Sequence, residues 1–186
     1  ITGMPRLIFF NNCCYRDTVF HQNICEKFTV GMIISVIYVY FGTDSGLKAV
    51  DGAMTGSKDT DLSRKLKGIR VRCLMEDSRG SLWVCTSGAG VWNVSEDGTI
   101  RVYSEKDGLL GDKFRTALEL KDGTIALAGD LGISFVQNGK ISGNIGASDG
   151  LSNPKVLCML QQKDGTLLAG TDGNGIAVIR DGKVQS

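Results

Sequence analysis

The sequence predicts an all-β fold built from β-propeller blades, each a four-stranded antiparallel sheet, with about three and a half repeats and an incomplete ring. Two observations support this prediction. The chain of 186 residues contains 25 glycines but only 2 prolines, and glycine without proline richness indicates many tight turns between short strands. In addition, three segments align with one another at a period of about 42 residues, and four strands in a repeat of that length are typical of a propeller.

Three independent sets of markers follow this period. The turn glycines Gly80, Gly123 and Gly165 are 43 and 42 residues apart. The triplet Asp-Gly-Leu begins at Asp107 and again at Asp149, 42 residues later. A further glycine follows the second strand of every unit, and these glycines are Gly46, Gly90, Gly132 and Gly175. The agreement indicates successive copies of one structural unit.

Each unit contains four short extended runs. In the first complete copy the runs are 71–76, 82–86, 91–94 and 100–103. The Asp-Gly and Asn-Gly steps between such runs favour hairpins, because glycine adopts a positive φ without steric cost. A β-sandwich also consists of short antiparallel strands, but it does not repeat its sequence this regularly. The propeller is therefore the better interpretation.

The predicted organisation has two parts. Residues 1–37 form an N-terminal segment to which the sequence assigns no structure, and residues 38–186 form the propeller repeats. The repeats divide into a partial blade at 38–68 and blades at 69–110, 111–152 and 153–186. Because the pattern runs off both ends, we expect the chain to be a piece of a longer protein.

Two stretches inside this scheme are ambiguous. The apolar run 28–41 is shorter than the roughly 20 residues of a membrane-spanning helix. We expect its second half to be a buried inner strand, and a remnant of a membrane or signal segment is the alternative. The polar stretch 58–67 is expected to be a long outer strand with a loop, or else a surface insertion.

Charge and reactive residues exclude several classes of function. The chain has 21 basic and 20 acidic residues, which gives no reason to expect nucleic acid or an anionic membrane as a partner.

Cys73, Cys85 and Cys158 lie in apolar runs, so we expect buried free thiols. Cys13, Cys14 and Cys25 have no assignment and could pair. With His21 as the single histidine and no Cys-x-x-Cys, the sequence favours neither a zinc site nor a histidine-based catalytic centre.

The motif inside the repeat resembles a known family. The stretch 74–91 reads Leu-Met-Glu-Asp-Ser-Arg-Gly-Ser-Leu-Trp-Val-Cys-Thr-Ser-Gly-Ala-Gly-Val and is similar to the two-component regulator propeller repeat. The copy at 160–176 keeps the Asp-Gly, Gly-Thr and Gly-x-Gly-Ile elements but has Leu168 where the first copy has Trp83. The resemblance covers 38–186. This chain departs from the family in having about three and a half repeats, where the family's propellers commonly have seven blades.

The resemblance implies a function. It suggests the ligand-sensing propeller module of a bacterial signal-transduction receptor, on the extracytoplasmic side of a membrane. An output kinase or cyclase domain would then follow in the same full-length chain, and the ligand would be an unknown small molecule or glycan. The module itself is expected to be no enzyme and to need no cofactor. The alternatives are a protein-interaction propeller scaffold and, less favoured, a propeller lyase.

Blade topology predicts where a ligand would bind. Strands alternate in direction, so the loop after strand two and the loop that joins blades share one face. On that face Lys113, Arg115, Asn153 and Lys155 are the predicted ligand-facing groups, and solvated loop residues are the alternative interpretation. Trp83 is expected to pack between blades and not to stack on a sugar. An open ring exposes strand edges and apolar faces, so we expect association, with a homodimer as one outcome.

Overall fold

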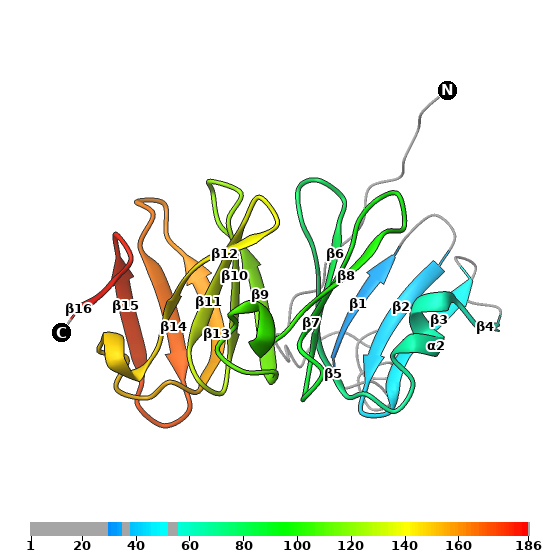
Figure 1. Ribbon diagram of the computed structural model, residues 1–186, viewed down its shortest axis with the longest axis horizontal. Helices are drawn as coiled ribbons and strands as arrows, with labels where there is room; N and C mark the ends of the chain where they lie inside the picture. Colours follow the sequence, from blue (N-terminus) through cyan, green and yellow to red (C-terminus); the bar gives the residue numbers. More distant parts are fainter. Residues whose placement is uncertain (1–29, 35–37, 52–55, 186) are drawn as a thin grey trace, which may run out of the picture.

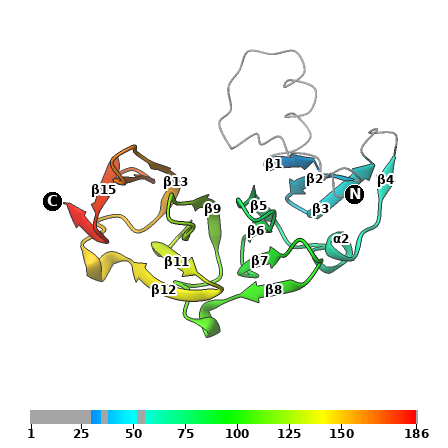
Figure 2. The same ribbon diagram turned by 90° about the horizontal axis from the view of Figure 1, so that it is seen from above.

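The computed structural model describes residues 30–34, 38–51 and 56–185 of the chain. Within these residues the chain forms four separate sheets, and each sheet consists of four antiparallel strands that follow one another in sequence order (Figure 1). Figure 2 shows the sheets as blades of an open arc whose ring is not closed. The predicted all-β propeller fold is therefore confirmed.

The strands of each blade have the following bounds. Blade 1 contains β1 (Val30–Ile34), β2 (Tyr38–Thr43), β3 (Gly46–Asp51) and β4 (Ser57–Lys58). Blade 2 contains β5 (Val71–Glu76), β6 (Leu82–Thr86), β7 (Val91–Val94) and β8 (Ile100–Tyr103). Blade 3 contains β9 (Phe114–Glu119), β10 (Ile125–Gly129), β11 (Ile133–Gln137) and β12 (Lys140–Ile145). Blade 4 contains β13 (Val156–Gln161), β14 (Leu167–Thr171), β15 (Ile176–Arg180) and β16 (Lys183–Gln185).

The innermost strands are the first strands of the four blades. Strands β1, β5, β9 and β13 pack successively on one another, and Figure 2 shows them on the concave side of the arc with β8 and β12 at the rim. Because β1 comes from 30–34, the first sheet has four strands where the sequence suggested a partial repeat. The apolar run 28–41 accordingly holds two paired strands, β1 and β2, where one inner strand was expected.

The blades are held together by apolar faces of their sheets. Between blades 2 and 3 the buried cluster includes Met75, Trp83 and Tyr103 on one side and Ile125 and Leu127 on the other. The Trp83 ring stacks on Tyr103 with 5.6 Å between ring centroids, and its Nε1 donates a 2.8 Å hydrogen bond to Oδ2 of Asp77. The expectation that Trp83 packs between blades is confirmed.

The Asp-Gly-Leu triplets form the connections between blades. A 3₁₀ turn at Glu105–Asp107 leads into Gly108 in the left-handed region, with φ of 101°, and Leu109 is then buried in the blade interface. The second triplet repeats this arrangement with a turn at Ala147–Asp149 and buried Leu151. In both copies the aspartate accepts a hydrogen bond from the backbone N–H three residues earlier.

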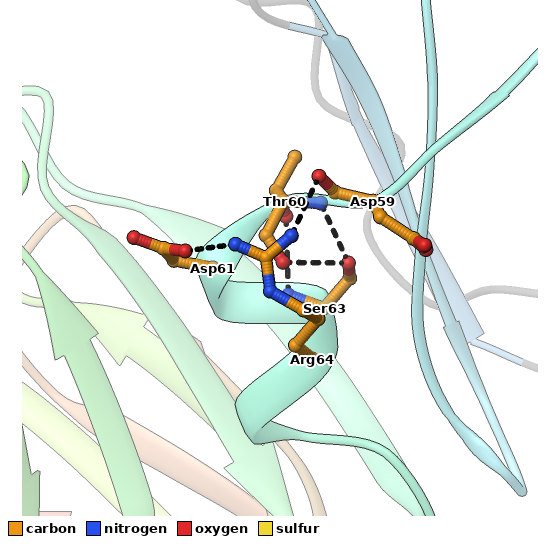
Figure 3. A network of polar contacts seen from close by, with 5 residues as sticks. All are labelled: Asp59, Thr60, Asp61, Ser63 and Arg64. Carbon is orange, nitrogen blue, oxygen red and sulfur yellow. Dashed lines mark hydrogen bonds and ion pairs between the residues drawn. The ribbon is translucent and has the colours of Figure 1, made fainter.

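The connection from blade 1 to blade 2 is different. Residues Asp61–Lys65 form helix α2, which the sequence analysis did not foresee in the polar stretch 58–67. Thr60 and Ser63 cap it reciprocally, each side chain accepting from the other's backbone N–H at 3.1 and 2.9 Å, and Arg64 binds Asp61 and the carbonyl of Asp59 (Figure 3). The helix forms because Leu62 and Leu66 bury one face of it between blades, while its charged face is solvated.

The cysteines within the described part of the chain are free. Cys73 and Cys85 face each other across β5 and β6 and are buried, as expected. Cys158 is exposed, so its predicted burial is wrong; β13 belongs to the last blade, and the described residues place no sheet on that face. Cys13, Cys14, Cys25 and His21 lie outside the described residues. Within those that are described, no helix has the length and apolarity needed to cross a membrane.

Candidate functional site

The loops after the second strands and the loops that join the blades meet on one face of the arc, which we call the loop face. The N–H groups of Gly88 and Gly90, in the loop after β6, both donate to the carbonyl of Asp112 at 3.0 Å. The N–H of Asp130 donates to the carbonyl of Lys113, and that of Asp172 to the carbonyl of Lys155. In Figure 1 the loops after β2 and β14 lie at the lower edge of the blades. The two kinds of loop therefore build one surface, as the topology predicts.

A threonine at the end of strand two shapes these loops. The hydroxyls of Thr43, Thr86 and Thr171 donate to the carbonyls of Gly46, Gly90 and Gly175 at 2.7, 2.7 and 2.9 Å. Thr86 is fully buried, and a buried hydroxyl without a partner would be destabilising. The bond therefore holds the loop closed at the glycine that leads into the third strand.

Every blade also carries an irregularity near the start of its innermost strand. The pairing with the second strand shifts between Val30 and Met32 in blade 1, between Val71 and Cys73 in blade 2, and between Val156 and Cys158 in blade 4. In blade 3 the shift falls opposite Arg115. The extra residue of such a bulge is left out of the ladder, and its side chain is re-aimed. In blades 2 and 3 that residue is an arginine, Arg72 and Arg115.

These arginines belong to a cluster of charged side chains. Arg115 Nε lies 2.6 Å from Oδ1 of Asp130, and Lys155 Nζ pairs with Oδ2 of Asp172. Arg70 Nε lies 2.5 Å from Oδ1 of Asp44, which joins blade 2 to blade 1. The acidic partner comes each time from the loop after strand two, directly after Thr43, Gly129 or Thr171.

Arg72 stands between these pairs. In its blade the loop position of the aspartates is occupied by Ser87, and Arg72 Nη2 lies 3.5 Å from Oγ of that serine. Burial lowers the pKa of Arg72, and the positive charges of Arg70 and Arg115 lower it further, while the carboxylates of Asp130 and Asp44 oppose this with smaller effects. The pKa of Asp172 is lowered by its hydrogen bond and charge interaction with Lys155, and Arg115 adds to this effect.

The electrostatic coupling shows that these side chains form one group. We call it the axial cluster, because its basic members lie at the ends of the innermost strands. Its members are Asp44, Arg70, Arg72, Arg115, Asp130, Lys155 and Asp172.

Two of the four residues predicted from the sequence, Arg115 and Lys155, are members of this cluster. Asn153 contacts the backbone of two cluster residues. Its Nδ2 donates to the carbonyl of Asp172, and its Oδ1 accepts from the N–H of Lys155 at 3.0 Å. Lys113 is exposed, and its backbone makes an isolated bridge with Ser87. None of these contacts tests ligand binding, so that role stays a prediction.

Arg70, Arg72 and the three aspartates were not among the ligand-facing residues predicted from the sequence. The aspartates did carry a signal, because each follows the last residue of a second strand at the same repeat position. Asp130 pairs with the bulge residue Arg115, whereas Asp44 and Asp172 pair with Arg70 and Lys155, which directly precede their inner strands. These pairings depend on contacts between strands and loops that have no sequence signature in this chain. Among the described residues, no group of three or more His, Cys, Asp or Glu side chains could hold a metal ion.

A shallow depression lies at the opposite end of blade 2. It is open and lined by turn residues, which are Arg79, Ser81, Ser95, Glu96 and Asp97. No ion pair joins these residues to one another in the described structure. The loop face is therefore the better candidate for recognition.

Comparison with known families identifies the repeat. Residues 65–88 match the family described as two component regulator propeller. This stretch contains the Trp83 motif and the end of β6, so the resemblance inferred from the sequence is confirmed: residues 65–88 match the repeat of this family. No curated protein matches the chain as a relative.

Solved structures share the fold. The extracellular domain of BT3049 from B. thetaiotaomicron, described as a hybrid two component system, matches with a TM-score of 0.66 and 18% identity over 80% of this chain and 23% of that one. The extracellular domain of BT4673 from the same organism, described likewise, matches with a TM-score of 0.65 and 17% identity over 99% and 27%. Virginiamycin B lyase from Staphylococcus aureus matches with a TM-score of 0.61 and 17% identity over 83% and 53%.

These likenesses establish the propeller fold. The chain spans about a quarter of the length of the two extracellular domains that it matches. A fold shared by a lyase and by domains of two component systems does not itself determine a function. The side chains of the loop face are therefore the better guide to the function of this chain.

Proposed function

We propose that this chain is the ligand-sensing propeller module of a bacterial signal-transduction receptor. In this proposal the module lies on the extracytoplasmic side of the membrane and carries no catalytic activity. Its ligand is a small molecule or glycan that binds at the loop face. An output kinase or cyclase domain in the full-length protein reads the binding event.

The observation that carries the proposal is the axial cluster. Two of its ion pairs, Lys155 with Asp172 and Arg70 with Asp44, join side chains that are about half exposed, and only the pair of Arg115 with Asp130 is more buried. Pairs of this kind contribute at most about 1 kcal/mol each to stability. Seven charged side chains gathered at the ends of the innermost strands are thus better explained by recognition than by folding.

The family repeat supports the same proposal. Residues 65–88 match the two component regulator propeller, and the blades have the fold of two extracellular domains of such systems. An aspartate of the cluster recurs in blades 1, 3 and 4 at one repeat position, the residue after strand two. A repeated polar position on a rigid scaffold is well suited to binding, since loops held by a stable framework place functional groups reproducibly.

The chemistry of the cluster supports a binding role without catalysis. Each of its carboxylates is engaged by a basic side chain, and the pKa of Asp172 is lowered by Lys155. A general base works best with a pKa near the operating pH, so a carboxylate held in this way is a poor one. The described residues contain no histidine.

Binding can be tested on the 186-residue chain with a glycan and metabolite library. We expect at least one compound to raise the melting temperature and to bind saturably by calorimetry. Arg115→Gln and Lys155→Gln should weaken this binding, whereas Arg79→Gln, at the opposite end of blade 2, should not. Mass spectrometry of the recovered ligand should show it chemically unchanged.

Other outcomes favour the alternatives. A ligand recovered in cleaved form would support a propeller lyase. Absence of binding across the library, together with capture of a defined protein by the loop face and its loss in Arg115→Gln, would support a protein-interaction scaffold. Either result would contradict the proposed function.

A further inference from the structure

We infer that the ligand of the loop face carries an oxyanion group, a carboxylate or a sulfate ester, and that Arg72 binds it. This inference rests on the proposed function and adds the chemical class of the ligand. It is based on a difference between the two bulge arginines: Arg115 has a carboxylate partner, whereas Arg72 has only a serine hydroxyl.

The two arginines occupy equivalent positions in neighbouring blades. Each is the residue after the first buried residue of its inner strand, Val71 or Phe114, and each stands where the ladder with the second strand is interrupted. Strands β5 and β9 pack on each other, and the charges of the two arginines act on one another. The bulges therefore bring two guanidinium groups to the same part of the loop face.

The two groups differ in their partners. Arg115 has a carboxylate at 2.6 Å, that of Asp130. At the matching loop position Arg72 meets Ser87, whose hydroxyl at 3.5 Å is neutral and at the limit of hydrogen bonding. Among the residues described, Arg72 forms no ion pair. One guanidinium of the cluster thus has a carboxylate in direct contact, whereas Asp44 and Asp130 act on the other only from a distance.

The charge balance of the cluster also favours an anionic ligand. Arg70, Arg72, Arg115 and Lys155 face three aspartates, so one positive charge remains uncompensated. Partial burial and two neighbouring cations disfavour the charged form of Arg72, as the lowered pKa indicates. An anion placed beside Arg72 would relieve this repulsion, whereas a neutral ligand would not.

An arginine suits this task better than a lysine. Its planar guanidinium presents several N–H donors in a fixed fork and can bind two oxygens of a carboxylate or sulfate at once. The Ser87 hydroxyl beside it can donate a further hydrogen bond to the same oxyanion. The aspartates on either side would repel an anion placed next to Asp44 or Asp130, which restricts the favourable position to Arg72.

The test uses simple probes on the whole chain. Glucuronate presents a carboxylate, glucose 6-sulfate presents a sulfate ester, and glucose is the neutral match. The Nε–H signals of the arginines are followed by ¹⁵N NMR, and affinity is measured by the same titration. We expect saturable shifts of the Arg72 signal with one or both anions and none with glucose.

Variants complete the design. Arg72→Gln should weaken binding of the effective anion at least about tenfold, the loss expected when a charged hydrogen-bond partner is removed. Arg72→Lys keeps the charge and should retain part of the affinity. Arg79→Gln removes one positive charge at the opposite end of blade 2 and should bind as the unaltered chain does.

Defined results would overturn the inference. One is a failure of both anions to shift the Arg72 signal. Another is equal affinity of the unaltered chain and Arg72→Gln for the effective anion. Binding of a neutral library compound at the loop face, lost in Arg115→Gln but unaffected by Arg72→Gln, would overturn the anion assignment while leaving the proposed function standing.

Discussion

Gly90 lies against the end of β8, so that a Cβ atom on it would come within 2.1 Å of the carbonyl oxygen of Tyr103. Gly46 and Gly132 repeat this contact with the carbonyls of Leu66 and Ile145, at 2.6 and 2.2 Å. The glycine marker that follows every second strand is thus explained by packing of a loop on the connection to the next blade. At Gly175, in the last blade, a Cβ would meet nothing within 4 Å.

This difference gives a matched pair of variants. Both glycines have a positive φ, 67° at Gly90 and 72° at Gly175, so alanine introduces a similar backbone strain of about 1–2 kcal/mol at each. Gly90→Ala adds a clash with backbone that cannot swing away, and we expect it to lower the free energy of unfolding by about 1–3 kcal/mol more than Gly175→Ala. Urea unfolding of the two variants measures the difference, and equal losses would contradict the packing explanation.

The repeat made most of the fold predictable. Hairpin turns are local, so the Asp-Gly and Asn-Gly steps indicate their strands without knowledge of the rest of the chain. The structure adds that Asn138 and Asp181 adopt a positive φ immediately before the glycine of such steps, which these residue types tolerate. Because hairpins join strands that are consecutive in sequence, these turns also predict the strand order within each blade.

Features that depend on tertiary contacts were missed. The apolar buried residues of helix α2 and its C-cap are Leu62 and Leu66, and two apolar residues four apart are too weak a signal within a charged stretch. The first strand, β1, precedes the part of blade 1 that resembles the repeat. The axial cluster was predicted only in part, because the positions of Arg70 and Arg72 relative to Asp44 and Ser87 depend on contacts between strands and loops that are remote in sequence.

The open face of blade 4 leads to a second prediction. Ile133 and Ile176 each begin the third strand of a blade, directly after the loop glycine. Ile133 is fully buried against blade 4, whereas Ile176 is 67% exposed. We expect Ile133→Thr to destabilise the chain by about 2–4 kcal/mol, because it buries a hydroxyl and removes a methyl group, and Ile176→Thr to change stability by less than about 0.5 kcal/mol. Thermal or urea unfolding distinguishes the two.

The same face should determine association. Leu160 is 60% exposed, and Leu157 and Ile176 lie on the same blade with comparable exposure. Apolar side chains gathered on an open sheet favour contact with another chain. Light scattering should show a concentration-dependent increase in mass that Leu160→Lys combined with Ile176→Thr reduces. A monomer at all concentrations in the unaltered chain would contradict this.

The first Asp-Gly-Leu connection leads to a prediction about pH. The carboxylate of Asp107 accepts hydrogen bonds from the N–H and the hydroxyl of Ser104, at 2.9 and 2.8 Å, and these bonds lower the pKa of Asp107 below its ordinary value of 3.8. The folded state therefore favours the ionised form. Its contribution to stability is present above pH 3.8 and is lost as pH falls through the lower pKa of the folded chain.

Asp107→Asn should accordingly remove part of the acid sensitivity. Its free energy of unfolding should be lower than that of the unaltered chain near neutral pH, and the two curves should converge as the pH falls below 3.8. Asp181→Asn, at a hairpin position where asparagine is equally well accommodated, controls for the loss of one negative charge. If Asp107→Asn and the unaltered chain differed by the same amount at pH 7 and at pH 2.5, the carboxylate would not stabilise the connection through its charge.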